Sequence, residues 1–157
     1  MIKMYICLNL FVVILFYIEG CSMIKTNIKR DKLDNQQVFD PLTRLIAEIL
    51  VDNVLSYTSD VLITYKDVSK KTGNKVYPIE LRSYLYTISN TCKEHNMPLL
   101  SAIVVNSDDL FPGHGFFEAY LPGLDEKTQM KEWFSMLNEI KEYKNWNRLL
   151  HILGKKN

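Results

Sequence analysis

Four lysines gathered in one short segment are the residues whose type and spacing most directly suggest chemistry. They are Lys66, Lys70, Lys71 and Lys75. Ammonium groups on one helix and on the turn after it can neutralise the phosphates of a nucleic acid. The same pattern is more often an ordinary solvated helix face, and a net charge of +1 supplies no global attraction to nucleic acid. The lysines therefore predict a local binding surface at most.

The sequence lacks the common catalytic and metal-binding patterns. Ser101 stands outside a G-x-S-x-G context, and there is no glycine-rich phosphate-binding loop. Asp108, Asp109 and His114 lie close together, but turn aspartates beside a Pro-Gly-His-Gly run more often stabilise turns than bind a cation. We therefore expect a non-enzymatic protein with no metal and no cofactor.

The N-terminus has the pattern of an export signal. A short basic start precedes residues 5–18, which are almost wholly apolar. A run of about 14 residues is short for a membrane-spanning helix, which needs roughly 20, but suits the core of a signal peptide. Of the three cysteines, Cys7 lies inside this run, and Cys92 falls on a helical apolar face where we expect a small buried hydrophobe.

The apolar run ends in Ile18-Glu19-Gly20-Cys21-Ser22. A cysteine after a small residue at this point resembles the lipobox of bacterial lipoproteins, although Glu19 departs from the small or aliphatic residue usual in that family. The resemblance implies that Cys21 becomes the first mature residue and carries a lipid, which places the protein on the extracytoplasmic face of the cell membrane. The alternatives are an uncleaved anchor, or translation from Met23, which would leave a cytoplasmic protein.

One domain accounts for the rest of the chain. The length of 157 residues suits a single core behind a leader, and 47% hydrophobic with 24% charged residues is typical of a globular protein. We divide the chain into a signal peptide or membrane anchor at 1–20, a polar tether at 21–40 and a winged-helix-like domain at 41–157.

Capping signals and apolar spacing predict the first helices of this domain. Asp40 followed by proline predicts a helix over 41–56. Thr64 with an aspartate three residues later resembles a capping box that opens a short helix, which Gly73 closes. A longer helix is expected from Pro78 to about 95–96. Its apolar face would consist of Leu81, Leu85, Ile88 and Cys92.

The pattern then changes to short β-branched and turn-rich segments. Residues 100–105 predict a buried strand, and residues 110–117 a wing or irregular return strand. Asp125 predicts a further helix, and residues 146–153 an apolar tail that covers the core. The inward face of that helix would consist of Met130, Trp133, Leu137 and Ile140. This order predicts an α+β fold, a single winged helix-turn-helix domain with a C-terminal helical extension.

Short motifs between residues 63 and 134 carry a more specific resemblance. They are Thr64-Tyr65, Gly73-Asn74, Arg82, Met97-Pro98, Val104-Val105-Asn106-Ser107, Gly115-Phe116 and Lys131-Glu132-Trp133. In this order they resemble the C-terminal winged-helix domain of the O6-alkylguanine alkyltransferases and the alkyltransferase-like proteins. The resemblance implies that Tyr65 contacts the backbone of an extruded nucleotide, and that Arg82 fills the gap left in the base stack. Without the resemblance, we would expect Tyr65 to be a packing residue and Arg82 to be an ordinary surface residue.

The chain departs from that family at the reactive cysteine. Where the family has this residue, the sequence reads Pro98-Leu99-Leu100-Ser101. Alkyl transfer needs a thiolate activated by a histidine, and neither stands there. We therefore expect a binding protein rather than a transferase. We favour a lipid-anchored binding module with a protein partner; the alternative is a cytoplasmic DNA-binding protein translated from Met23.

Overall fold

The computed structural model describes residues 39–56 and 60–154, which belong to one compact unit. The leader, Cys21 and nearly all of the polar tether lie outside the described residues, so the predictions made for them stay predictions. Within the described ranges, no helix combines the length and the apolar character that a membrane crossing requires.

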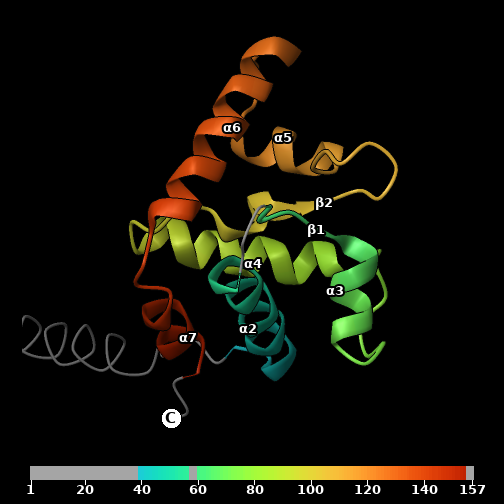
Figure 1. The fold of residues 1–157 in the computed structure, drawn as a ribbon, viewed down its shortest axis with the longest axis vertical. Helices are drawn as coiled ribbons and strands as arrows, with labels where there is room; N and C mark the ends of the chain where they lie inside the picture. Colours follow the sequence, from blue (N-terminus) through green and yellow to red (C-terminus); the bar gives the residue numbers. More distant parts are fainter. Residues whose placement is uncertain (1–38, 57–59, 155–157) are drawn as a thin grey trace, which may run out of the picture. The chain divides into compact units, whose positions relative to one another are not determined.

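The described part of the chain is mainly helical, with a small parallel sheet. The helices are α2 (Pro41–Leu55), α3 (Tyr65–Lys71), α4 (Leu81–Glu94), the 3-10 helix η1 (Leu100–Ile103), α5 (His114–Tyr120), α6 (Glu126–Glu142) and α7 (Asn147–Leu153). Strands β1 (Ile63–Thr64) and β2 (Val104–Val105) pair in parallel, with Ile63 opposite Val104. Figure 1 shows the strand pair between α4 and α5. The α+β prediction is confirmed in this coarse form.

Helix α2 begins where the sequence predicts. The carboxylate of Asp40 accepts a hydrogen bond from the backbone N–H of Leu42 at 2.8 Å, and Pro41 occupies the first helical position. The aspartate favours a helix start because the first backbone N–H groups of a helix have no partner within it. The proline favours it because proline has no backbone N–H group that would need a partner. The residues that α2 buries lie along one face: Thr43, Ile46, Ala47, Leu50, Val51 and Val54.

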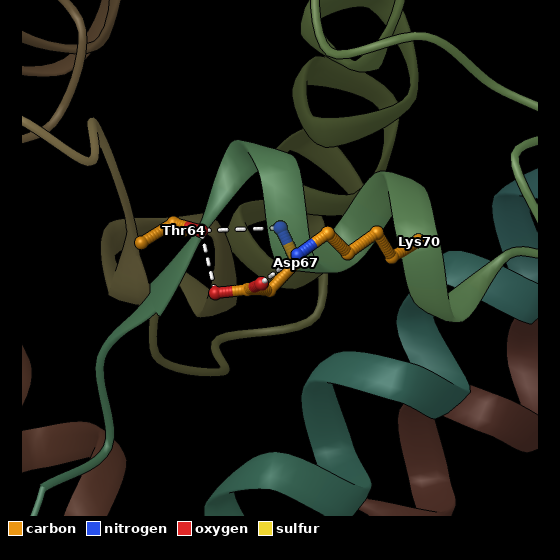
Figure 2. A network of polar contacts seen from close by, with 3 residues as sticks. All are labelled: Thr64, Asp67 and Lys70. Atoms are coloured by element: carbon orange, nitrogen blue, oxygen red, sulfur yellow. Dashed lines mark hydrogen bonds and ion pairs between the residues drawn. The ribbon is translucent and has the colours of Figure 1, made fainter.

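Helix α3 begins at a capping arrangement that Figure 2 shows in detail. The hydroxyl of Thr64 accepts from the backbone N–H of Asp67 at 3.1 Å and donates to the Asp67 carboxylate at 2.7 Å. Lys70 lies 3.5 Å from the same carboxylate. The Thr64 hydrogen bond, followed by the charge of Lys70, holds the pKa of Asp67 below its usual value. Gly73, with φ of +72°, ends this helix in the left-handed conformation that glycine adopts most easily.

Thr64→Ala should lower the free energy of unfolding by about 1 kcal/mol, because the first turn of α3 loses its cap. The pKa of Asp67 should rise toward its ordinary value. A carboxyl group whose pKa is lowered by folding stabilises the folded state at every pH above its unfolded-state pKa of about 4. This stabilisation is lost as the pH falls through the lower pKa of the folded state. The difference between wild type and variant should therefore shrink in acid.

Urea denaturation between acidic and neutral pH, together with NMR titration of Asp67, measures both effects of the Thr64 substitution. Thr64→Ser is the matched control, because it removes the methyl group and keeps the hydroxyl. A Thr64→Ser variant as unstable as Thr64→Ala would show that the cap is not the cause.

Helix α4 buries the face that its spacing predicts. Leu81, Leu85, Ile88 and Cys92 are all buried, and the helix ends at Glu94, with His95 as its C-cap, before Pro98. Its first residue is Leu81 rather than Pro78, because Pro78 and the two residues after it form a turn in which Glu80 donates its backbone N–H to the Tyr77 carbonyl. The expectation that Cys92 is a buried hydrophobe is confirmed.

The predicted strand over residues 100–105 is only partly correct. Residues Leu100–Ile103 form a 3-10 helix, and only Val104–Val105 pair with another strand. The partner β1 offers only two residues, so the ladder cannot extend further. All six residues are nonetheless buried, as an apolar run predicts.

The predicted wing at residues 110–117 is wrong. The backbone N–H of Asn106 donates to the carbonyl of Phe111 at 2.9 Å, which closes a compact loop, and no strand follows. Pro112 has no N–H to donate to a ladder. Helix α5 then begins at His114 and buries Phe116, and the spacing of Phe116 and Tyr120 suits a helix rather than a strand.

The C-terminal helices match the prediction of a helical extension. Asp125 caps α6 by accepting from the backbone N–H of Thr128 at 3.1 Å. Trp133, Leu137 and Ile140 are buried on its inner face, whereas Met130 is only half-buried. The predicted apolar tail is confirmed as α7 with the residue before it, which buries Trp146, Leu149 and Leu153.

Candidate binding pocket

A pocket of about 410 Å³ lies between α4 and α5. Its remaining walls come from the first residue of α3, from η1 and from the loop between β2 and α5. In Figure 1, α3 lies at one end of α4, and α5 lies on the other side of the strand pair from α4. The volume falls within the range of roughly 300–1,000 Å³ that is usual for small-molecule sites.

Tyr65 and Arg82 meet at this pocket, although they belong to different helices. The backbone N–H of Gly113 donates to the hydroxyl oxygen of Tyr65 at 3.4 Å. A Cβ atom at Gly115 would lie 3.0 Å from Nη2 of Arg82, so the guanidinium lies directly against the backbone at the start of α5. The structure therefore brings together the two residues that the family resemblance selected.

The electrostatics of these two side chains favour a neutral phenol beside a cation. Burial raises the pKa of Tyr65, while the hydrogen bond from Gly113 and the charge of Arg82 oppose the rise only in part. Tyr65 therefore stays a hydroxyl donor at neutral pH. Among the described residues, none of the three ion pairs includes Arg82.

A small hydroxyl cluster, formed by Ser89, Ser101 and Tyr120, lies beside the pocket. The hydroxyl of Ser101, which lines the pocket, hydrogen-bonds to the hydroxyl of Ser89 on α4. The hydroxyl of Tyr120 is buried without a geometrically adequate hydrogen-bond partner among the described residues. Burial raises the pKa of Tyr120, and the nearby hydroxyl of Ser89 holds down only part of that rise. Buried hydroxyls of this kind usually have a partner, which a water or a ligand can supply.

Apolar and aromatic side chains form the rest of the wall. Leu85 and Phe116 are buried, and Tyr86 lines the outer part of the pocket while staying largely exposed. Pro78 lies at the rim, next to Ile79, whose side chain is 88% exposed.

The four lysines do not belong to the pocket. Lys66, Lys70 and Lys71 are exposed on α3, and Lys75 is exposed in the turn that follows. Lys70 is paired with Asp67 at 3.5 Å. The lysines therefore lie on the helix whose first residue is Tyr65, outside the cavity that Tyr65 lines.

One serine, Ser101, is among the described residues that line the pocket. No histidine, cysteine or carboxylate is found among the described residues that line it, so Ser101 has no base beside it. The described ranges hold no group of three potential metal ligands. Asp109 instead accepts the backbone N–H of Phe111 at 2.9 Å, and His114 lies 3.3 Å from Glu118.

Cys92 lies near the hydroxyl cluster but is not a candidate nucleophile. Its side chain is fully buried, and burial raises the pKa of its thiol to about 11. At pH 8 the thiolate fraction is therefore about a thousandth.

We expect the folded protein of residues 23–157, in which Cys92 is the one cysteine, to react with a thiol reagent at pH 8 far more slowly than the urea-unfolded chain. Absorbance of the released thiol chromophore measures both rates. Equal rates in the folded and unfolded states would contradict the burial of Cys92.

Sequence reasoning missed several residues of this site, among them Asn106, Phe116 and Tyr120. Phe116 and Tyr120 were missed because the sequence between Leu110 and Phe117 suggested a wing. Ser101 was considered only as a nucleophile. The helical spacing of the aromatic residues from Phe116 was the one signal that could have placed them together.

No protein-family model matches this chain, and no curated protein and no solved structure matches it significantly. The resemblance to the alkyltransferase winged helix therefore rests on its motifs alone.

Proposed function

We propose that this chain is a non-enzymatic binding protein whose binding site is the pocket at Tyr65 and Arg82. One observation carries the proposal. Two residues from separate helices, selected by motif alone, converge on the same cavity, where Gly113 and Gly115 contact them. The absence of a general base among the described residues of the pocket favours binding over catalysis.

The scaffold of this binding site is, in our proposal, a modified winged helix. Helix α3, the turn at Gly73 and helix α4 supply the helix-turn-helix part. The loop between β2 and α5 takes the place of the wing without forming a hairpin. This loop contacts Tyr65 through Gly113, while Gly115 in the first turn of α5 lies against Arg82.

We further propose that a lipid on Cys21 holds the protein at the extracytoplasmic face of the membrane, where the pocket serves a protein or small-molecule partner. The support is the apolar run that ends at Cys21. Cells labelled with radioactive palmitate should incorporate label into the wild type and not into Cys21→Ala, which should also leave the membrane fraction. A soluble, unlabelled wild type that begins at Met23 would contradict the anchor.

The alternative is nucleic-acid binding in the cytoplasm, which the convergence of Tyr65 and Arg82 favours. A gel shift of residues 23–157 on duplex DNA at low salt tests it. Arg82→Ala should weaken binding at least about tenfold, while Arg148→Ala, an exposed arginine on α7, is the control. Tyr65→Phe should also weaken binding. Lys66→Ala should reduce the slope of affinity against salt by about one.

The nucleic-acid alternative fails if DNA does not bind at low salt. It also fails if Arg82→Ala and Tyr65→Phe bind as the wild type does, since a surface that attracts DNA by charge alone would not use the pocket.

A further inference from the structure

The pocket carries one charge, and that charge is positive. Arg82 is the sole ionisable group other than tyrosines among the described residues that line the pocket, and none of the described ion pairs engages it. A guanidinium beside an apolar cavity favours an anion, because its N–H groups match the oxygens of a carboxylate or phosphate. Residue Arg82 is exposed, so an anion can reach its guanidinium from solvent.

Tyr65 supplies a second donor beside Arg82. Its hydroxyl oxygen accepts from Gly113, which leaves the hydroxyl proton free to donate to another group. Because burial raises its pKa, the phenol keeps that proton at neutral pH. An anionic group at this position would thus meet a cation and a neutral donor together.

The walls beyond these donors suit a flat ring. Leu85 and Phe116 are buried and face the cavity from α4 and α5, and Tyr86 flanks its outer part. Ser101 and Tyr120 also line the cavity, and the hydroxyl of Tyr120 has no adequate partner among the described residues. A polar substituent at the far end of a ring could complete this cluster.

We propose that the pocket binds a small aromatic anion, with its carboxylate or phosphate oxygens at Arg82 and Tyr65 and its ring against Leu85 and Phe116. This inference rests on the proposed function, that the pocket is the binding site, and adds the chemical class of its ligand. A hydroxyl at the far end of the ring would reach Ser101 and Tyr120.

Amide NMR shifts of the protein purified from cells that express the full chain, in mild detergent, test the proposal. The aromatic anions are para-hydroxybenzoate and phenyl phosphate, which separate a carboxylate from a phosphate preference. The controls are para-hydroxybenzyl alcohol, which keeps the ring without the charge, and cyclohexanecarboxylate, which keeps the charge without the aromatic ring. At least one aromatic anion should shift the Gly113 and Gly115 amides and bind about tenfold more tightly than either control.

Two variants of the pocket locate the contact. Arg82→Gln should weaken binding of the aromatic anion about tenfold. Its affinity for the neutral alcohol should be unchanged. Gly115→Ala keeps the charge of Arg82 but places a Cβ against its guanidinium. This variant should therefore also bind the anion more weakly. Arg148→Gln, on α7, is the matched control and should bind as the wild type does.

The inference is overturned if no aromatic anion binds up to about 10 mM, or if the neutral alcohol binds equally well. It is also overturned if Arg148→Gln weakens binding as much as Arg82→Gln does, because the effect would then be one of net charge. Palmitate labelling and the gel shift use no probe compound, so failure here leaves those two tests of the proposed function unaffected.

Discussion

Trp133→Ala is expected to lower the free energy of unfolding by about 3–5 kcal/mol, the largest effect of any single substitution considered for this protein. The indole is 2% exposed, and its Nε1–H donates to the carbonyl of Ala102 at 2.8 Å. Phe111 meets the ring edge to face at a centroid distance of 5.7 Å. The substitution therefore leaves a cavity between α6 and η1 and also removes a buried hydrogen bond.

Urea denaturation followed by far-ultraviolet circular dichroism measures the effect of Trp133→Ala. The midpoint should fall by roughly 2 M urea if the slope is typical of a small domain. Trp133→Phe should lie between wild type and alanine, because it keeps most of the ring volume and loses the hydrogen bond. Phe134, at the next position, is 54% exposed, so Phe134→Ala should lower the free energy of unfolding far less. Equal losses at both positions would mean that α6 does not cover the core as described.

The parts of the fold that the sequence predicted are those specified by neighbouring residues. Asp40, Thr64 and Asp125 each cap a helix through bonds to a backbone N–H two or three residues away. Both partners of such a bond lie within a few residues of each other, so a short window of sequence contains them. The buried face of α4 was predicted for the same reason, since its spacing is a property of one helix.

The strands and the wing could not be predicted in this way, because a strand needs a partner. Among the described residues, Val104–Val105 pairs only with Ile63–Thr64, and the apolar run before it coils into η1. The segment after it contains Gly113 and Gly115, which suit a turn or a wing as well as the start of a helix. Whether this segment forms a wing or the start of a helix depends on the burial of Phe116 against the core, which is a tertiary contact.

The pocket was predicted in part. Tyr65 and Arg82 were selected because a resemblance joined them, and the structure places both at one cavity. The remaining wall comes from segments that only the folded chain brings together, including Ser101 and Tyr120. The lysines of α3 illustrate the converse, because they are close to Tyr65 in sequence and still lie outside the pocket.

The hydroxyl cluster under the pocket leads to the second large effect. Ser89 and Ser101 are buried and bond to each other, so removing one hydroxyl leaves the other without that partner. A buried polar group left unpaired costs about 1–3 kcal/mol, whereas removing both members of a pair costs much less than the sum. Ser89→Ala and Ser101→Ala should therefore each destabilise the protein, and the double variant should be more stable than additivity predicts.

The two single variants should also differ from each other. Ser89 faces both Ser101 and Tyr120, and its interaction with Tyr120 holds down part of the rise in the pKa of that phenol. Ser89→Ala therefore deprives two hydroxyls of a neighbour and should be the more destabilising change in urea denaturation. It should also raise the pKa of Tyr120 further, as measured by ultraviolet titration, whereas Ser101→Ala should leave that pKa nearly unchanged. Equal stabilities and equal tyrosine titrations would mean that Ser89 does not link the pocket wall to α5.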